Sequence, residues 1–139
     1  DEIWHAGDAG SIELLDELNA FRPLRAVYGN IDDQKVRAAH PQDQLFMCES
    51  IKIYITHIGG YPGRYNPRAK KIIEREEPGI FISGHSHILK VIPDKKHQLL
   101  HINPGAAGSQ GLHKKITMMR FTIDGDQIKD LEIFEKSRK

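Results

Sequence analysis

Short apolar runs, each followed by a glycine or a polar residue, alternate with amphipathic stretches in the first part of the chain. Residues 3–6 and 24–28 are apolar runs of strand length, and a glycine follows each of them. Ser11 precedes a stretch with apolar residues on one helical face, and Asp32 or Asp33 precedes a second helical stretch that ends near residue 39. This order favours a parallel sheet with a functional site at the carboxyl ends of its strands.

The remainder of the chain is predicted to be mainly strand, with one further helix. Runs 44–48 and 51–56 predict a hairpin, and Pro67 begins a helical stretch that extends to residue 76. Strands are also expected over residues 79–83, 88–92, 98–102, 116–123 and 127–134, and the last two are joined by a turn at residues 124–126. Residues 137–139 are expected to fray. We therefore expect an α/β fold in which residues 1–139 form a single domain.

Composition and charge narrow the classes of function. Hydrophobic residues make up 39% of the chain and charged residues 28%, which is typical of a folded globular protein. The net charge of +1 predicts neither a basic stripe for nucleic acid nor attraction to an anionic membrane. The apolar runs are also far shorter than the roughly 20 residues of a membrane-spanning helix. A cytoplasmic location is the expectation.

Side chains that bind metals follow four of the predicted strands. Asp8 and Asn30 each come after a glycine at a strand end, and His57 follows run 51–56. His85 and His87 follow run 79–83, and they would share one face if that strand continued through them. Where such strand ends meet, a carboxylate, an amide oxygen and imidazoles form a mixed shell that suits manganese, iron, nickel or zinc better than calcium.

Each of these residues also has an ordinary structural explanation. Asp8 and Asn30 belong to the residue types that are common in turns, His57 alone is a polar strand end, and a His-X-His pair is often found on a surface. The ordered set of motifs favours the metal site over these explanations. His5 is expected to pack behind the site, and His101 and His113 are weaker candidates for its neighbours.

The motifs resemble those of the calcineurin-like metallophosphoesterase superfamily, in which D-X-H, G-D, G-N, a histidine and G-H-X-H follow one another. The matching segments are Gly7-Asp8, Gly29-Asn30, His57 and Gly84-His85-Ser86-His87. The resemblance covers essentially the whole chain and is closest to the small bacterial and archaeal phosphodiesterases, which share the Asn-Pro-Gly loop at residues 103–105. It implies a mixed β-sandwich of two sheets flanked by helices, here without the first strand and helix.

The resemblance also implies a role for each matched residue. Asp8 would bridge two divalent transition-metal ions, either manganese, nickel, iron or zinc. Asn30, His57 and His85 would complete one metal site, and His87 would bind the other ion together with the D-X-H residues. D-X-H does not occur here, so we expect an N-terminal segment to be absent, one ion to bind well, the second to bind poorly, and activity to be low. In the family a metal-bridging hydroxide attacks phosphorus in line.

The expected function is therefore a divalent-metal-dependent phosphoesterase, most simply a phosphodiesterase with a small phosphate-ester substrate. Ile31 stands where the large Ser/Thr phosphatases have a histidine that assists the leaving group, so the general acid is unassigned. One alternative is a non-catalytic protein-interaction scaffold of the same fold, like the retromer subunit, and another is a metal-binding regulatory domain. Residues 61–65 and the terminal hairpin are candidate contacts of a homo-oligomer.

Overall fold

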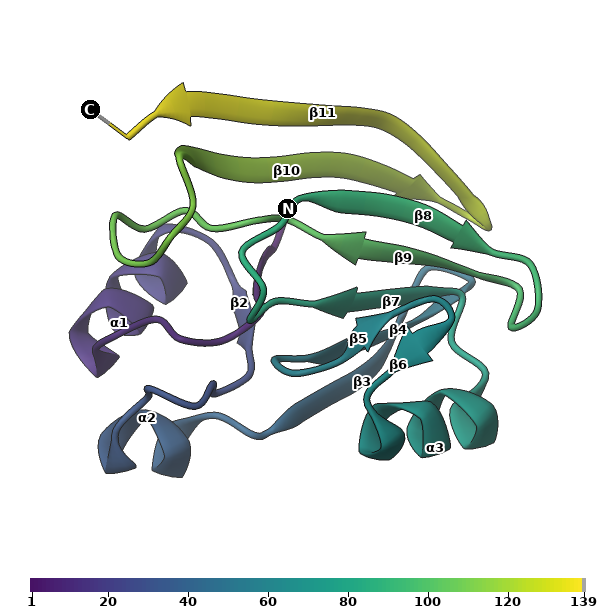
Figure 1. Cartoon of the computed structure of the whole chain (residues 1–139), viewed down its shortest axis with the longest axis horizontal. Helices are drawn as coiled ribbons and strands as arrows, with labels where there is room; N and C mark the ends of the chain where they lie inside the picture. The colour runs from purple at the N-terminus through teal and green to yellow at the C-terminus, as the bar shows by residue number, and fades with distance from the viewer. Residues whose placement is uncertain (139) are drawn as a thin grey trace.

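A five-stranded mixed sheet forms the centre of the fold (Figure 1). The computed structural model describes residues 1–138. The strand order is β3-β4-β7-β9-β8, in which the three inner strands are parallel and the two edge strands are antiparallel to their neighbours. These strands are β3 (Asp43–Cys48), β4 (Ile51–Thr56), β7 (Ile80–Ser83), β8 (Lys90–Asp94) and β9 (Leu99–Asn103).

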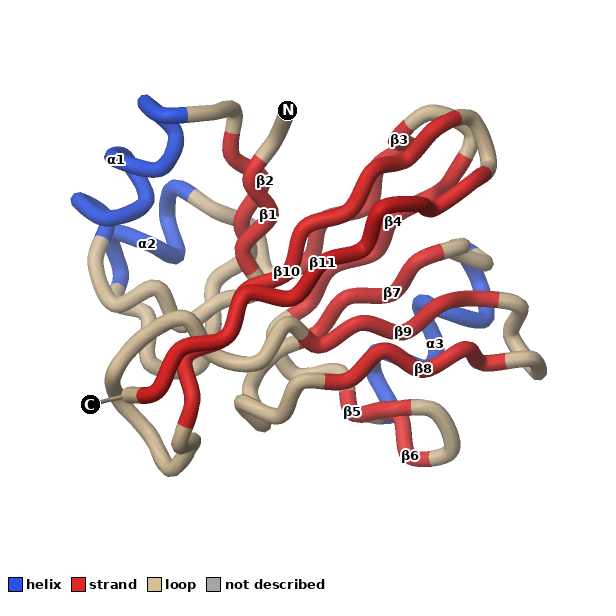
Figure 2. The backbone as a smooth tube through the Cα atoms, turned by 90° about the horizontal axis from the view of Figure 1, so that it is seen from above, coloured by secondary structure: helices blue, strands red, loops and turns tan. Residues whose placement is uncertain are grey.

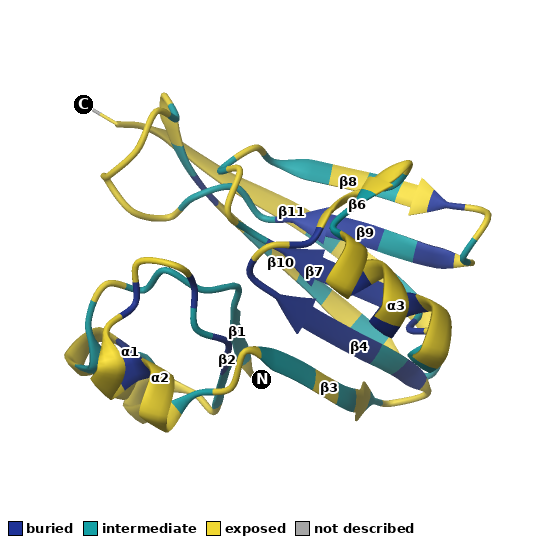
Figure 3. Cartoon of the chain, turned by 60° about the horizontal axis from the view of Figure 1, so that its bottom comes forward, coloured by how far each residue is buried: buried dark blue, intermediate teal, exposed yellow. Residues whose placement is uncertain are grey.

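Two-stranded pairs and helices cover this sheet. The pairs are parallel β1 (Ile3–His5) with β2 (Leu24–Ala26), and antiparallel β5 (Gly60–Tyr61) with β6 (Arg64–Tyr65) and β10 (Lys115–Asp124) with β11 (Gln127–Ser137). The helices are α1 (Ile12–Phe21), α2 (Gln34–Ala39) and α3 (Pro67–Glu76). The β10–β11 hairpin crosses one face of the central sheet (Figure 2), whereas α3 covers the opposite face (Figure 3). Helices α1 and α2 pack beside β1 and β2. Within residues 1–138, no helix has the length and apolar character needed to span a membrane.

Alternate residues of the central strands face two separate cores. On β4, Ile53 and Ile55 face the side of the hairpin, whereas Tyr54 packs with α3. β7 repeats the pattern, since Ile80 and Ile82 join the first core while Phe81 joins the second. This alternation is the two-residue period of a strand that is covered on both faces, and it confirms the predicted mixed sandwich.

The helices begin where the sequence predicts them. The Ser11 hydroxyl accepts the Leu14 N–H at 3.2 Å at the start of α1, and the Asn66 side chain caps α3 just before Pro67. Of the two candidates for the α2 cap, Asp33 is the residue that caps the helix. The other, Asp32, is buried and has a different role, which is described below.

The four strands with polar ends do not all lie in one sheet. β1 and β2 form a separate pair, and the Gln44 side chain links that pair to β3 by donating to the Ala26 carbonyl at 3.1 Å. Among the described residues, no backbone ladder joins β2 to β3. The prediction that residues 137–139 fray was wrong at Ser137, which pairs with Lys115 in the terminal hairpin. Residue 139 lies outside the described residues.

His101 on β9 gives the fold a pH dependence. Its side chain is 1% exposed, its Nδ1 donates to the Phe81 carbonyl at 3.2 Å, and burial lowers its pKa to about 4. His101 is therefore protonated near pH 6.5 in the unfolded chain but only near pH 4 in the folded chain. We expect the free energy of unfolding to fall by up to about 3 kcal/mol as the pH decreases through this window, and to be fully retained above it.

Urea unfolding at pH 7 and at pH 4.5 checks this expectation. His101→Leu removes the titrating ring, so its free energy of unfolding should fall less than that of the wild type between the two pH values. The variant should also be less stable at pH 7, because the Phe81 carbonyl loses its side-chain donor. Equal decreases in the two proteins would contradict this role of His101.

Candidate metal centre

The carboxyl ends of β1, β2, β4 and β7 meet at one end of the central sheet (Figure 1). The Gly84 N–H donates to the His57 carbonyl at 2.9 Å, which joins the ends of β7 and β4. The β1 end joins them through a contact of 2.7 Å between the Ala6 carbonyl and the His57 ring. Side chains that lie far apart in the sequence thus project into the same space.

His57 is 5% exposed, and its two ring nitrogens have different surroundings. Because the Ala6 carbonyl can only accept, Nδ1 carries the proton of the neutral ring and Nε2 carries a lone pair. That lone pair faces Oδ2 of Asp8 at 3.0 Å and Oδ1 of Asn30 at 2.9 Å. In the neutral ring a nitrogen lone pair and two oxygens thus converge, an arrangement that a bound cation stabilises.

Asp8 reaches this point from a tight turn. Its backbone φ is 60°, a left-handed conformation that is costly for a residue other than glycine. The Ile31 N–H donates to Oδ1 of Asp8 at 3.0 Å and fixes the carboxylate. Gly29 is required here, because a Cβ atom at this position would collide with Asp8 Oδ1. The G-N motif therefore makes room for the aspartate of the G-D motif.

His85 lies at the centre of a three-residue turn. The Ser86 N–H donates to the Gly84 carbonyl at 2.8 Å, and the φ of His85 is 67°. The strand does not continue through His85 and His87, since β7 ends at Ser83 and the φ of His87 is 63°. The turn directs the two imidazoles separately.

The ligand atoms of Asp8, His57 and His85 lie within 4.8 Å of one another. Oδ1 of Asn30 adds a neutral oxygen, 3.1 Å from Nδ1 of His85. One carboxylate, one amide oxygen and two imidazoles match the ligands of a borderline divalent ion such as manganese, nickel or zinc. The residues present therefore fit a transition-metal ion.

His87 lies beside this group, and its ring packs edge-to-face on His113 with centroids 5.0 Å apart. Burial lowers the pKa of His87, and the proximity of His113 lowers it further, while the Asp8 carboxylate opposes these effects. The ring is therefore near the metal-competent group but packs on a residue that the motifs do not contain.

Asp32 is the important residue that the motif analysis missed. Its carboxylate accepts the backbone N–H groups of Asp8 at 2.9 Å, Gly29 at 2.7 Å and Gly10 at 3.1 Å. These bonds tie together the two loops that carry Asp8 and Asn30. Its position two residues after Asn30 was visible in the sequence, but helix capping explained an aspartate there equally well.

The remaining histidines either pack in the core or lie beside the site. His5 accepts the Gly7 N–H on Nδ1 at 3.1 Å, and thus supports the loop before Asp8. The prediction that His101 is a neighbour of the site was wrong, because its ring packs on Phe81 in the core. His113 contacts His87, as noted above.

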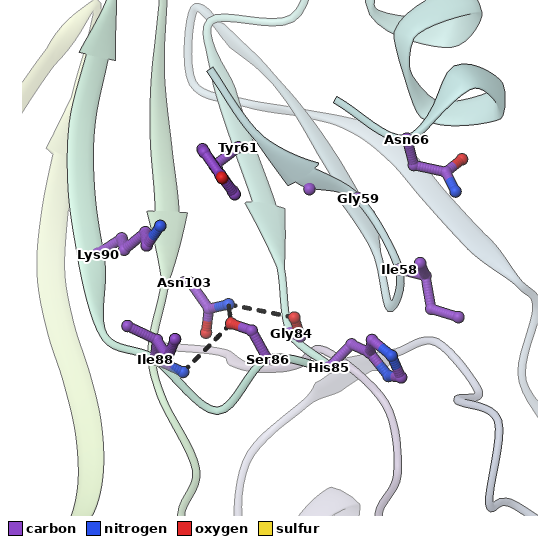
Figure 4. A pocket seen from close by; sticks show the side chains of 11 residues that line it. Ile58, Gly59, Tyr61, Asn66, Gly84, His85, Ser86, Ile88, Lys90 and Asn103 are labelled. Atoms are coloured by element: carbon purple, nitrogen blue, oxygen red, sulfur yellow. Dashed lines mark hydrogen bonds between the residues drawn. The ribbon is translucent and has the colours of Figure 1, made fainter. Parts of the chain in front are cut away.

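A cavity of about 240 Å³ adjoins His85 (Figure 4). Ile58 lies on the same side as His85, and Tyr61 lies opposite, with the Lys90 ammonium 3.8 Å from its ring centroid. Asn103 fixes the base of the cavity by donating to the Gly84 carbonyl and the Ser86 hydroxyl, both at 3.1 Å. The cavity therefore offers an aromatic face and a cation next to the candidate metal centre.

The fold and this centre define a metallophosphoesterase-type domain, and comparison with known proteins agrees. A family model described as the calcineurin-like phosphoesterase superfamily domain matches residues 1–126. The chain belongs to this superfamily.

Individual relatives give the same result. A "probable metallophosphoesterase" of Methanothermobacter thermautotrophicus is 29% identical over 133 residues, which are 94% of this chain and 73% of that protein. A structure of Vps29 from Entamoeba histolytica complexed with Zn²⁺ has a TM-score of 0.73 at 17% identity, covering 100% of this chain and 83% of the other. An archaeal phosphodiesterase has a TM-score of 0.72 at 18% identity, covering 96% and 83%. The two structures show that the fold is shared.

Proposed function

We propose that this protein is a divalent-metal-dependent phosphodiesterase whose metal centre is formed by Asp8, Asn30, His57 and His85. The observation that carries the proposal is the convergence of His57 Nε2 with oxygens of Asp8 and Asn30. The chain belongs to a superfamily of phosphoesterases, which supports the same function. His87 is assigned to a second metal position. When bound, divalent ions act as Lewis acids toward phosphate oxygens and lower the pKa of a coordinated water.

The chain's own residues prepare this site in three ways. The Ala6 carbonyl holds the proton of His57 on Nδ1, so that Nε2 is available without a change of tautomer. Asp32 and Ile31 hold Asp8 in its left-handed turn through backbone N–H groups. The carboxylate and the neutral imidazoles leave net positive charge on a bound divalent ion, which favours an anionic phosphate ester. These groups are in place before substrate arrives.

The cavity beside His85 supports a diester rather than a monoester. A phosphodiester carries a second ester substituent, and the cavity, which His85 also lines, provides an aromatic face and the Lys90 ammonium. A monoester has one ester substituent, which is the leaving group, and so has no second substituent to place there. The diester preference therefore rests on Tyr61 and Lys90, which lie outside the proposed ligand set.

Hydrolysis by the full-length protein tests this function. With Mn²⁺ or Ni²⁺ we expect turnover of bis-p-nitrophenyl phosphate to exceed turnover of p-nitrophenyl phosphate, and EDTA to abolish both. Metal uptake alone does not decide between an enzyme and a scaffold, because a Vps29 structure is itself described as a Zn²⁺ complex. Absence of turnover with both esters in the metal-loaded protein would support the scaffold instead.

Tyr61→Ala tests the assignment of the cavity. Loss of the ring contact should raise KM for bis-p-nitrophenyl phosphate by about tenfold, whereas KM for the monoester should stay the same. Phe21→Ala is the matched control, since Phe21 is a 67% exposed aromatic residue at the end of α1. An equal increase of KM for both esters would contradict the diester cavity.

A further inference from the structure

Lys90 has surroundings that set it apart from the other lysines of the chain. Among residues 1–138, only Lys52 and Lys90 are partly buried lysines, and all the others are exposed. The Lys52 ammonium has a counter-ion, since it lies 3.3 Å from the Glu76 carboxylate. No carboxylate oxygen of the described residues lies within 4.0 Å of the Lys90 ammonium. A partly buried charge without a counter-ion is unfavourable, so its position requires an explanation.

The ring of Tyr61 holds this ammonium without neutralising it. Nζ of Lys90 lies 3.8 Å from the centroid of the ring. The face of an aromatic ring attracts a cation through its quadrupole but carries no net charge. The backbone of Lys90 is fixed as well, because Lys90 begins β8 and pairs with Asn103 of β9. The positive charge is therefore held in one place and remains available to another group.

The cavity that Lys90 shares with His85 contains no acidic side chain. None of the 11 residues that line it is an aspartate or a glutamate. Ile58 and Ile88, which are 43% and 56% exposed, add apolar surface to its wall. Figure 4 shows Lys90 on a different side of the cavity from His85. The cavity thus has the candidate metal centre on one side, apolar surface along its wall and an unpaired cation on the other side.

We propose that Lys90 selects phosphodiesters whose second ester substituent carries its own anionic group, a carboxylate or a phosphate. The proposal rests on the proposed function, because this group belongs to the same substrate whose reacting phosphate lies at the metal centre. The anion takes the place of the missing counter-ion and accepts a charge-assisted hydrogen bond from Nζ. The carbon skeleton between the two anionic groups lies against Ile58 and Ile88. A neutral second substituent leaves the ammonium unpaired.

Two matched diesters test this preference in the full-length protein with Mn²⁺. p-Carboxyphenyl p-nitrophenyl phosphate and p-carbamoylphenyl p-nitrophenyl phosphate have similar size, and only the first has a charged second substituent. In both, water adds to phosphorus as the bond to p-nitrophenolate breaks, so one absorbance measures both reactions. We expect kcat/KM to be at least about tenfold higher for the carboxylate, because only the carboxylate supplies a charge opposite to that of Lys90. Equal values for the carboxylate and the amide would overturn the proposal.

Variants assign the preference to this side chain. Lys90→Gln removes the charge at similar length, so the ratio of the two kcat/KM values should fall to about one, whereas Lys90→Arg should keep most of it. Lys95→Gln is the matched control and should keep the wild-type ratio, because Lys95 is an exposed lysine in the turn between β8 and β9. A preference that persists in Lys90→Gln would overturn the role of Lys90. In the wild type, a p-phosphonophenyl diester compared with the carboxylate shows which of the two anions binds better.

Equilibrium dialysis of the same diesters against the Mn²⁺-loaded protein separates this inference from the proposed function. If both diesters are hydrolysed with equal efficiency, the phosphodiesterase proposal stands and the role of Lys90 fails. If neither is hydrolysed, the phosphodiesterase proposal fails and dialysis decides the role of Lys90. Tighter binding of the carboxylate than of the amide, lost in Lys90→Gln, then supports an anion site at Lys90, and equal binding overturns it.

Discussion

Replacement of His57 by alanine is expected to lower kcat/KM for bis-p-nitrophenyl phosphate by at least about a thousandfold, or about 4 kcal/mol of transition-state stabilisation. His57 contributes the nitrogen that faces both Asp8 and Asn30, so its loss removes one proposed ligand and leaves the Asp8 carboxylate without its imidazole neighbour. Loss of an outer-shell partner typically lowers metal affinity by about 10–100-fold, and loss of His57 as a ligand should lower it further. Steady-state kinetics with excess Mn²⁺ and metal analysis of the dialysed protein measure the two effects.

His97→Ala is the matched control for this variant. His97 is also an imidazole that binds a carboxylate, since its Nδ1 lies 2.8 Å from Asp94, but it lies in the turn between β8 and β9 rather than at the strand ends. Its removal should leave kcat/KM within about twofold of the wild type. If His57→Ala retained more than about a tenth of wild-type activity, His57 would not belong to the metal centre.

The sequence predicted which segments carry the site because strand ends have a recognisable pattern. Asp8, Asn30, His57 and His85 each follow a short apolar run, and the parallel pairing of β1 with β2 and of β4 with β7 brings their carboxyl ends together. Local patterning also located the Ser11 cap and the start of α3 at Pro67, since helix starts depend on only a few neighbouring residues. These features depend on short stretches of chain.

The conformations of the ligand-bearing residues could not be predicted in this way. Asp8, His85 and His87 all have positive φ values, which their residue types do not favour. Contacts from distant segments impose these conformations, as when Ile31 and Asp32 bind the Asp8 loop. A pattern of alternating residues is typical of an extended strand instead, in which His85 and His87 would share a face.

The contact between His87 and His113 could not be predicted from the sequence, although His113 was a weaker candidate for a neighbour of the site. His113 belongs to no motif and follows His87 by a long loop and two strands, so only the folded chain shows that the two rings meet. His101 gives the opposite case, because it lies close to the Asn-Pro-Gly loop in sequence and yet points into the core beside Phe81. Proximity along the chain is therefore a poor guide to the surroundings of a histidine.

Asp32→Asn should damage both stability and metal binding. The carboxylate accepts three backbone N–H groups, whereas asparagine keeps one acceptor oxygen and places an NH₂ group against a donor. Loss of bonds to a charged acceptor predicts a decrease of about 3 kcal/mol in the free energy of unfolding. Because the loops of Asp8 and Asn30 lose their common tie, metal affinity should also fall by about 10–100-fold.

Asp33→Asn is the control, since Asp33 caps α2 and asparagine caps a helix as well as aspartate does. Urea unfolding of the metal-free proteins and Mn²⁺ titration well below the unfolding midpoint separate the two effects. A variant that loses stability but binds Mn²⁺ like the wild type would make Asp32 a purely structural residue. A loss of affinity in the still-folded protein would instead make it a positioning residue, because Asp32 contacts Asp8 only through the backbone and so acts on the carboxylate by holding its turn.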